Sequence, residues 1–272
     1  MKNPIPLLAA AAAIAVAALT ACGAPGDVAA VAPASATATT AGPRPTIVLV
    51  HGAFEDASSW SPVVKRLQAD GYPVFAPAVP LRGVAADVGA IEGAVAAIEG
   101  PKILVGHSYG GLLISELANR TPDVTALVYV AAFIPQAGEM AGQLNSQFPG
   151  SLIGPTSTHT VDGPDGPELY VNPESFAALF AGGLPAADVA ASAAEQRPIL
   201  ASAFDEKITA AAPAGIRKHA IVATEDKAIS PEAERFEAQR AQAVVTEVRS
   251  PHAVPAANPQ AVVDVIHQAA AG

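Results

Sequence analysis

The chain has few of the residues that build disulfide frameworks, metal sites or nucleic-acid-binding surfaces. It contains one cysteine, Cys22, so neither a disulfide framework nor a cysteine nucleophile is expected in the folded domain. Its 15 lysines and arginines stand against 25 aspartates and glutamates, and they form no basic run. The resulting net charge of −10 argues against nucleic acid as a partner and against electrostatic docking to anionic lipid. Zinc-ligand spacing, H-E-x-x-H, a Walker loop and G-x-G-x-x-G are also missing, so the sequence predicts no metal and no nucleotide cofactor.

The first residues form a separate unit. Lys2 precedes an apolar, alanine-rich run over residues 5–19, which is too short for a comfortable membrane span. The run ends in Leu-Thr-Ala-Cys22, which resembles a bacterial lipobox, where the signal peptide is cleaved before a cysteine that receives a diacylglycerol. Residues 1–22 are therefore predicted to be a lipoprotein-type signal peptide with Cys22 as its lipidation site. An ordinary signal peptide with an incidental cysteine is the alternative, and export is expected in both cases.

Residues 23–44 are expected to be a flexible tether. They consist mainly of Ala, Thr, Pro, Ser, Val and Gly, a composition that cannot bury enough apolar surface to fold. About 20 flexible residues would give a root-mean-square reach of roughly 25 Å. Two or three acyl chains attach a protein firmly, so we expect a membrane-anchored, extracytoplasmic lipoprotein.

Strand-like and helix-like segments alternate through residues 45–272, and 51% of the whole chain is apolar. The predicted strands are 46–50, 73–76, 102–105, 125–131, 219–223 and 244–248. The predicted helices are 59–69, 84–98, 112–120, 231–242 and a closing helix around 262–269. Apolar runs without alternation suit strands covered on both faces, so the order predicts an α/β domain with a mostly parallel sheet. The alternation fails over about 135–212, where short helical pieces around 176–180, 185–195 and 198–204 predict an inserted helical lid.

Ser108 is the predicted nucleophile. It stands in Gly106-His107-Ser108-Tyr109-Gly110, the G-x-S-x-G form of a nucleophile elbow on a sharp strand-to-helix turn. The pattern alone occurs by chance in about one chain in ten of this length. Here an apolar strand precedes it and a helix follows it, as an elbow requires.

The partners of Ser108 follow from chain order, which in this type of site is serine, then acid, then histidine. His252 lies just after the last predicted strand, where parallel sheets place their ligands. His159 falls in the lid, whereas His219 and His267 are expected to be structural or exposed. Either Glu225 or Asp226 could be the acid, because both follow the preceding strand. The oxyanion donors are expected to be the backbone N–H groups of Tyr109 and of Ala53, in the loop after the first strand.

These residues together resemble the α/β-hydrolase superfamily, and within it the small-lidded group of methyl-salicylate-type esterases and hydroxynitrile lyases. The matching stretches are Val48–Ala53, Val105–Gly111, Ala131–Pro135 and Ala223–Lys227, followed by Pro231 and Phe236–Gln239. The resemblance covers most of residues 46–270 in outline, but not the lid. It implies that Asp226 rather than Glu225 is the acid, and it supports Ala53 and Tyr109 as oxyanion donors.

Two departures from the lyases of this group favour ester hydrolysis. Those lyases carry a threonine where Gly52 stands, and a cyanide-stabilising lysine where this chain has Ala253. The sequence therefore predicts a cofactor-free serine hydrolase acting on a small or medium ester through Ser108, His252 and Asp226. Apolar lid residues favour an apolar ester: Phe148, Leu152, Ile153, Phe176, Leu179, Phe180 and Leu184. A carbon–carbon lyase and a non-catalytic ligand-binding protein are the alternatives.

Overall fold

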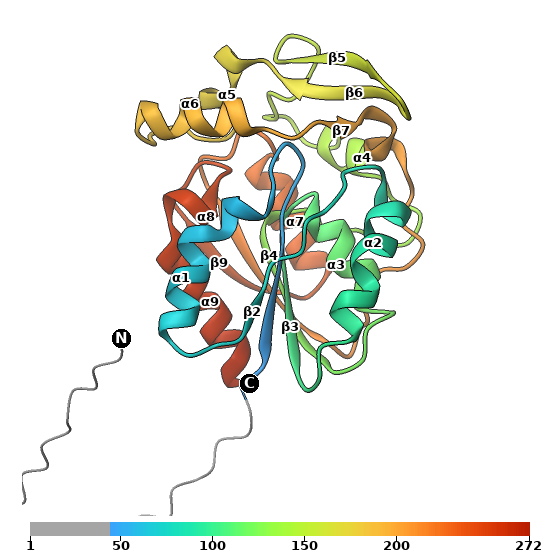
Figure 1. The fold of residues 1–272 in the computed structure, drawn as a ribbon, viewed down its shortest axis with the longest axis vertical. Helices are drawn as coiled ribbons and strands as arrows, with labels where there is room; N and C mark the ends of the chain where they lie inside the picture. The colour runs from blue at the N-terminus through green and yellow to red at the C-terminus, as the bar shows by residue number, and fades with distance from the viewer. Residues whose placement is uncertain (1–43) are drawn as a thin grey trace, which may run out of the picture. The chain divides into compact units, whose positions relative to one another are not determined.

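The computed structural model describes residues 44–272, and a six-stranded parallel sheet forms its centre (Figure 1). In spatial order the strands are β2 (Val74–Phe75), β1 (Thr46–Val50), β3 (Lys102–Ser108), β4 (Val124–Ala132), β8 (Arg217–Ala223) and β9 (Val244–Val248). Every neighbouring pair is parallel. The predicted α/β fold is confirmed, and the strands expected at 46–50 and 244–248 have the predicted bounds.

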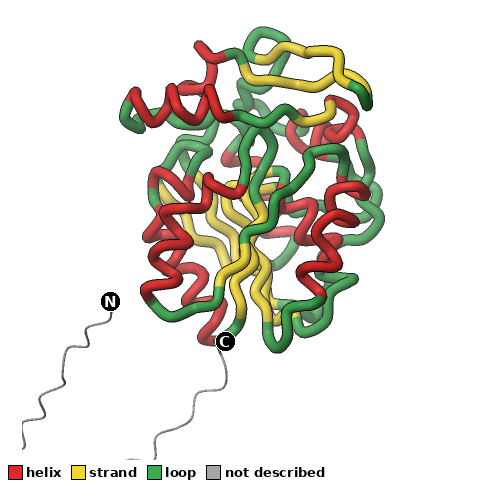
Figure 2. Tube along the Cα trace, in the orientation of Figure 1, coloured by secondary structure: helices red, strands yellow, loops and turns green. Residues whose placement is uncertain are grey.

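Two apolar layers cover the sheet, because successive side chains of a strand point to opposite faces. In β1, Ile47 and Leu49 join one layer and Val48 and Val50 the other. The first layer is completed by η1 (Ala57–Trp60), α1 (Ser61–Ala69), α8 (Val254–Ala257) and α9 (Pro259–Ala271). The second is completed by α2 (Val84–Ala96), α3 (Gly110–Leu117) and α7 (Pro231–Arg240). Figure 2 shows helices flanking the strands, so both faces of the central strands are buried, as their unbroken apolar runs predict.

A lid is inserted between β4 and β8, close to the predicted bounds. Its elements are α4 (Ala141–Ser146), β5 (Thr158–Gly163), β6 (Gly166–Val171), α5 (Pro173–Leu179), α6 (Ala186–Glu195), β7 (Ile199–Leu200) and η2 (Ala201–Asp205). The expectation of a helical lid is only partly right, because β5, β6 and β7 form an antiparallel sheet. The helix expected at 198–204 is a short strand followed by a 3-10 turn. Most residues of β5 are exposed, and the strand therefore lacks the apolar run by which the sheet strands were predicted.

The predicted signal peptide, Cys22 and residues 23–43 of the predicted tether lie outside the described residues. Over residues 44–272, no helix combines the length and the apolar character needed to cross a membrane.

Candidate active site

Ser108 lies on the sharp turn that the sequence predicts, between the end of β3 and the start of α3. Its φ of +54° is in the left-handed region, which is uncommon for a residue other than glycine and is often found at functional sites. The flanking glycines are required by close backbone contacts. A Cβ added at Gly106 would lie 2.6 Å from the carbonyl oxygen of Gly110, and one at Gly110 would lie 2.5 Å from that of Val50. The turn is therefore held by packing that leaves no space for side chains beside Ser108.

His252 and Asp226 form a buried pair at the carboxyl ends of β9 and β8. The Nδ1–H of His252 donates to Oδ2 of Asp226 at 2.5 Å. The other carboxylate oxygen, Oδ1, accepts the N–H groups of Ala228 at 2.6 Å and Ile229 at 2.9 Å. These bonds fix the direction of the carboxylate and place the imidazole proton on Nδ1. The lone pair of Nε2 is thus available to act as a base.

His252 lies against the residue that precedes Ser108. The ring centroids of His107 and His252 are 4.7 Å apart. In the described part of the chain Nε2 of His252 is buried without a hydrogen-bond partner, so the bond from Ser108 Oγ is not formed. Catalytic hydrogen bonds are often long without substrate and tighten in the substrate complex. The structure thus pairs Asp226 with His252 and places the His252 ring against the elbow that bears Ser108, with no hydrogen bond between the serine and the histidine.

The structure distinguishes the two candidate acids. Glu225 points to the surface, where it accepts from Nε of Arg249 at 2.6 Å, whereas Asp226 faces His252. The remaining histidines after Ser108 take no part in the cluster. His159 contacts Asn172 in the lid, and His267 stacks on Tyr72 with ring centroids 5.4 Å apart.

Two free backbone N–H groups lie beside Ser108, at the predicted oxyanion donors. A Cβ added at Gly52 would lie 2.8 Å from Cβ of Ser108, so the loop after β1 packs directly on the serine. Ala53 follows in that loop, and Tyr109 follows Ser108. Among residues 44–272, neither Ala53 nor Tyr109 donates its N–H to a backbone carbonyl. A tetrahedral oxyanion needs two such donors near the nucleophile.

The structure adds a second histidine–carboxylate pair that the sequence did not predict, with a buried histidine and a partly buried glutamate. His107 bonds through Nδ1 to Oε2 of Glu55 at 2.9 Å and through Nε2 to the main-chain oxygen of His252 at 2.9 Å. In the sequence His107 occupies a variable position of G-x-S-x-G, and Glu55 belongs to no motif. Only the folded chain shows that the two residues meet.

Aromatic rings of the lid and of the loop after β1 cover the site. Phe180 packs edge to face on His252, with ring centroids 5.0 Å apart, and its carbonyl accepts the N–H of Ala253 at 2.8 Å. Phe204 contacts Tyr109 and stacks on Phe54, with ring centroids 6.4 Å apart in each pair. Ser108 is consequently only 8% exposed.

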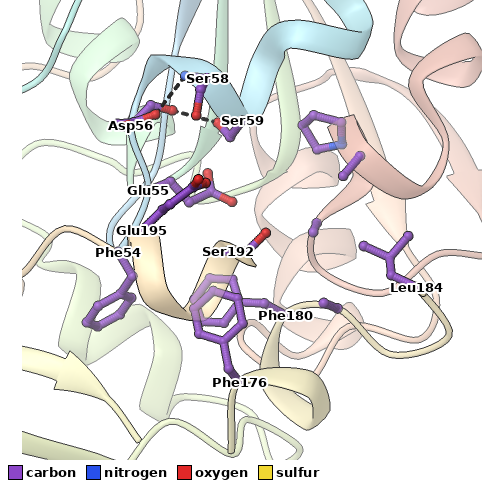
Figure 3. A pocket seen from close by; sticks show the side chains of 14 residues that line it. Phe54, Glu55, Asp56, Ser58, Ser59, Phe176, Phe180, Leu184, Ser192 and Glu195 are labelled. Carbon is purple, nitrogen blue, oxygen red and sulfur yellow. Dashed lines mark hydrogen bonds between the residues drawn. The ribbon is translucent and has the colours of Figure 1, made fainter. Parts of the chain in front are cut away.

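A small cavity of about 80 Å³ lies between the loop after β1, the lid and the segment after His252 (Figure 3). Phe176, Phe180 and Leu184 form an apolar wall, while acidic side chains form another: Glu55, Asp56 and Glu195. Ser108 is not among its lining residues. A larger cavity of about 680 Å³ lies within the lid and reaches Phe204. Within residues 44–272, His, Cys, Asp and Glu side chains form no group of three or more able to hold a metal ion.

Several curated relatives align with part of the chain. A pyrethroid hydrolase of Sphingobium wenxiniae is 35% identical over 124 residues, which cover 39% of this chain and 44% of that protein. Esterase PIR7B of Oryza sativa subsp. japonica is 36% identical over 116 residues, covering 37% and 43%. The chain therefore spans less than half the length of these relatives.

Solved structures match over a larger share of the chain. Tomato methylketone synthase I complexed with 2-tridecanone superposes with a TM-score of 0.71 at 22% identity, covering 83% of this chain and 97% of that chain. Polyneuridine aldehyde esterase gives 0.71 at 18% identity, covering 83% and 99%. At these identities the likeness shows the fold. The model described as the alpha/beta hydrolase family matches residues 47–265. Because that match spans most of the chain, the protein belongs to the alpha/beta hydrolase family.

Proposed function

We propose that the chain is a serine hydrolase that cleaves a small or medium carboxylic ester through an acyl-enzyme intermediate. One observation carries the proposal: the buried Asp226–His252 pair leaves Nε2 free beside the elbow that bears Ser108. The names of the relatives, a pyrethroid hydrolase and esterases, support ester hydrolysis as the reaction class.

The first half of the reaction acylates Ser108. Its Oγ attacks the ester carbonyl carbon while Nε2 of His252 takes the hydroxyl proton, and Asp226 stabilises the imidazolium. The N–H groups of Ala53 and Tyr109 then stabilise the oxyanion of the tetrahedral intermediate. Collapse of that intermediate breaks the bond to the alcohol oxygen, which takes the proton from His252.

The second half releases the acid. A water molecule loses a proton to Nε2 of His252 as its oxygen attacks the acyl carbon. The new tetrahedral intermediate collapses, Ser108 Oγ leaves and regains its proton from His252, and the carboxylic acid dissociates. The cycle uses no redox step.

An apolar ester fits the surroundings of the site. Phe176, Phe180 and Leu184 line the cavity next to Ala253, the residue that follows the proposed base. Burial of such a group against aromatic rings stabilises binding by about 25 cal/mol per Å² of apolar surface.

Two rival functions predict other results. A carbon–carbon lyase needs a cation near the leaving cyanide, and Ala253 provides none. A threonine at position 52, as in the lyases, would be forced onto Ser108, because any Cβ there lies 2.8 Å from Cβ of the serine. A non-catalytic binding protein would have no use for a strained serine beside a base without a hydrogen-bond partner.

The test combines fluorophosphonate labelling with hydrolysis of short p-nitrophenyl esters. We expect the wild type to show both, Ser108→Ala to lose both, and Ser146→Ala, at an exposed serine of the lid, to match the wild type. Retention of either activity in Ser108→Ala would overturn the mechanism. Release of aldehyde from a cyanohydrin would favour the lyase, and tight ligand binding without turnover would favour the binding protein.

We also propose that Cys22 anchors the exported chain to a membrane through a lipid. The support is the lipobox-like Leu-Thr-Ala-Cys22 after an apolar run. Cys22→Ser is expected to move the full chain from the membrane fraction to the soluble fraction of its host. An unchanged membrane fraction would contradict the anchor.

A further inference from the structure

Both ring nitrogens of His107 face hydrogen-bond acceptors. Nδ1 lies 2.9 Å from the carboxylate oxygen of Glu55, and Nε2 lies 2.9 Å from the main-chain oxygen of His252. Neither a carboxylate nor a carbonyl oxygen can donate a proton. A neutral imidazole carries one N–H and would leave one of these contacts without a hydrogen. With Glu55 ionised, only the imidazolium form satisfies both contacts; a neutral His107 would need Glu55 as the carboxylic acid, donating to Nδ1.

The charges in this region agree with that assignment. Burial lowers the pKa of His107, but the charge and hydrogen bond of Glu55 outweigh it, so the pKa lies above the usual value. Burial raises the pKa of Glu55, but His107 outweighs it and the pKa lies below the usual value. The other ionisable groups facing the pair are His51 from the loop after β1, Asp226 from the loop after β8, and the His252 ring from the loop after β9.

We propose that Glu55 holds His107 as a buried imidazolium, and that this ion pair positions the catalytic base by donating to the main-chain oxygen of His252. The hydrogen-bonded series Glu55–His107–His252 joins two loops and the end of a strand. Glu55 is two residues after Ala53 in the loop after β1, His107 directly precedes Ser108 at the end of β3, and His252 follows β9. The pair thus ties the oxyanion loop, the nucleophile and the base to one another.

His252 is consequently held from two directions. Asp226 fixes its ring through Nδ1, while His107 fixes its backbone through the carbonyl. Without the second bond the loop after β9 could shift and carry Nε2 away from Ser108. Misplacement of a catalytic group by about 1 Å costs on the order of 10²-fold in rate. Glu55 and His107 act through His252, so they are positioning residues. The kinetic part of this inference depends on the proposed function.

The protonation state is tested without any reaction. The full chain, labelled with ¹⁵N at the histidine rings, is examined by NMR at about pH 8, where an unperturbed histidine is neutral. We expect one doubly protonated ring, which is absent from His107→Gln and is therefore His107. In Glu55→Gln the same ring is expected to become neutral, with its remaining proton on Nε2. A neutral His107 ring in the wild type would overturn the proposal.

The positioning role is tested by comparing two changes at Glu55. Glu55→Ala leaves His107 without its partner, and we expect kcat to fall about 10- to 100-fold with little change in KM. Glu55→Gln keeps both hydrogen bonds of His107 with a neutral ring. The amide N–H of the glutamine can donate to Nδ1, while Nε2–H still donates to the main-chain oxygen of His252. This variant should therefore keep kcat close to wild type. Glu247→Gln, in an exposed ion pair with Arg235, is the control for loss of a glutamate charge.

Two kinetic outcomes would contradict the positioning role of Glu55 and His107. Wild-type kcat in Glu55→Ala, or equal loss in Glu55→Gln and Glu55→Ala at wild-type melting temperatures, would contradict the positioning role. If Glu55→Ala does not fold, the NMR measurement on the wild type and Glu55→Gln still decides the charge of His107, and a large loss of kcat in Glu55→Gln would contradict the positioning role. If the wild type neither hydrolyses esters nor reacts with fluorophosphonate, the proposed function fails, while the charge of His107 is tested independently.

Discussion

The sheet and the lid of this molecule hold their residues in different ways. Central strands such as β3 are buried along their whole length, between two apolar layers. In the lid, α6 has no buried residue and β5 is mostly exposed. Every proposed catalytic group lies at the carboxyl end of a sheet strand or in the loop that follows it, whereas the lid contributes rings that pack over them. The proposed catalytic groups are thus on the densely packed part of the molecule, and the rings that cover them are on the less buried part.

Hydrogen bonds and ion pairs join these parts at several places. At one of them the carbonyl of Phe180 accepts the N–H of Ala253 at 2.8 Å. At another, where the chain leaves β4 for the lid, Glu237 of α7 accepts the N–H of Ile134 at 2.6 Å. Arg240 of the same helix pairs with Glu139 at 2.6 Å. The predictions below alter the sheet, the junction and the lid in turn.

The largest effect is expected at the acid of the sheet. Asp226→Asn replaces the acceptor of the His252 proton by an amide, which favours the wrong tautomer, and the same change in a serine protease lowers kcat about 10⁴-fold. Glu225→Gln, next in sequence but in an exposed ion pair, should match the wild type. Steady-state ester hydrolysis measures both. Equal losses in the two variants would contradict the assignment of Asp226.

A smaller loss is expected from crowding the oxyanion loop. The added Cβ of Gly52→Ala would lie 2.8 Å from Cβ of Ser108 and would displace the loop that carries the Ala53 N–H. Loss of one oxyanion donor typically lowers kcat about 10²- to 10³-fold. Gly93→Ala is the control, because nothing lies within 4 Å of the Cβ added there in α2. Full activity in Gly52→Ala would show that the loop can shift without cost.

At the junction, stability should depend on pH through Glu237. Burial raises the pKa of this glutamate from 4.5 to about 7. The folded state therefore binds the proton of Glu237 more tightly than the unfolded state does. The resulting contribution to the free energy of unfolding is fully present below about pH 4.5 and is lost as pH rises to about 7. This contribution is about 3 kcal/mol.

Urea unfolding at about pH 4.5 and pH 8 measures this contribution. Glu237→Gln should lose it, while Glu232→Gln, at an exposed position of the same helix, should keep the wild-type difference. An unchanged pH dependence in Glu237→Gln would contradict the assignment.

The smallest effect is expected in the lid. Leu184→Ala removes three carbon atoms from the wall of the small cavity, and we expect the preference between short and longer esters to change about tenfold. The melting temperature should change little, because this leucine is only partly buried. Leu152→Ala, at an exposed lid residue outside that cavity, is the control. An unchanged ester preference would place the substrate elsewhere.

The contrast between the buried sheet and the less buried lid also explains which features could be predicted from the sequence. The central strands of the sheet are buried apolar runs, and they order the elbow and the acid loop along the chain. The strand before the histidine loop, β9, is mostly exposed, but its valines still mark it as a strand. In the hairpin of the lid, β5 is mostly exposed and β6 is mostly half-buried, and neither strand carries such a run. Glu225 and Asp226 are adjacent and equally charged, so only the direction of their side chains separates them. Glu55 and His107 are 52 positions apart in the sequence, and no local pattern records their contact.

The position of the lid in the chain has a consequence for conformational entropy. The lid lies between β4 and β8, which are hydrogen-bonded neighbours from Ala126 and Arg217 onward. Residues 133–216 therefore form a closed loop whose two ends are fixed by strand pairing. The entropic cost of closing such a loop grows only logarithmically, by about 0.6 kcal/mol for each doubling of its length. Changes in the length of the exposed parts of the lid, such as the β5–β6 turn, therefore cost little closure entropy.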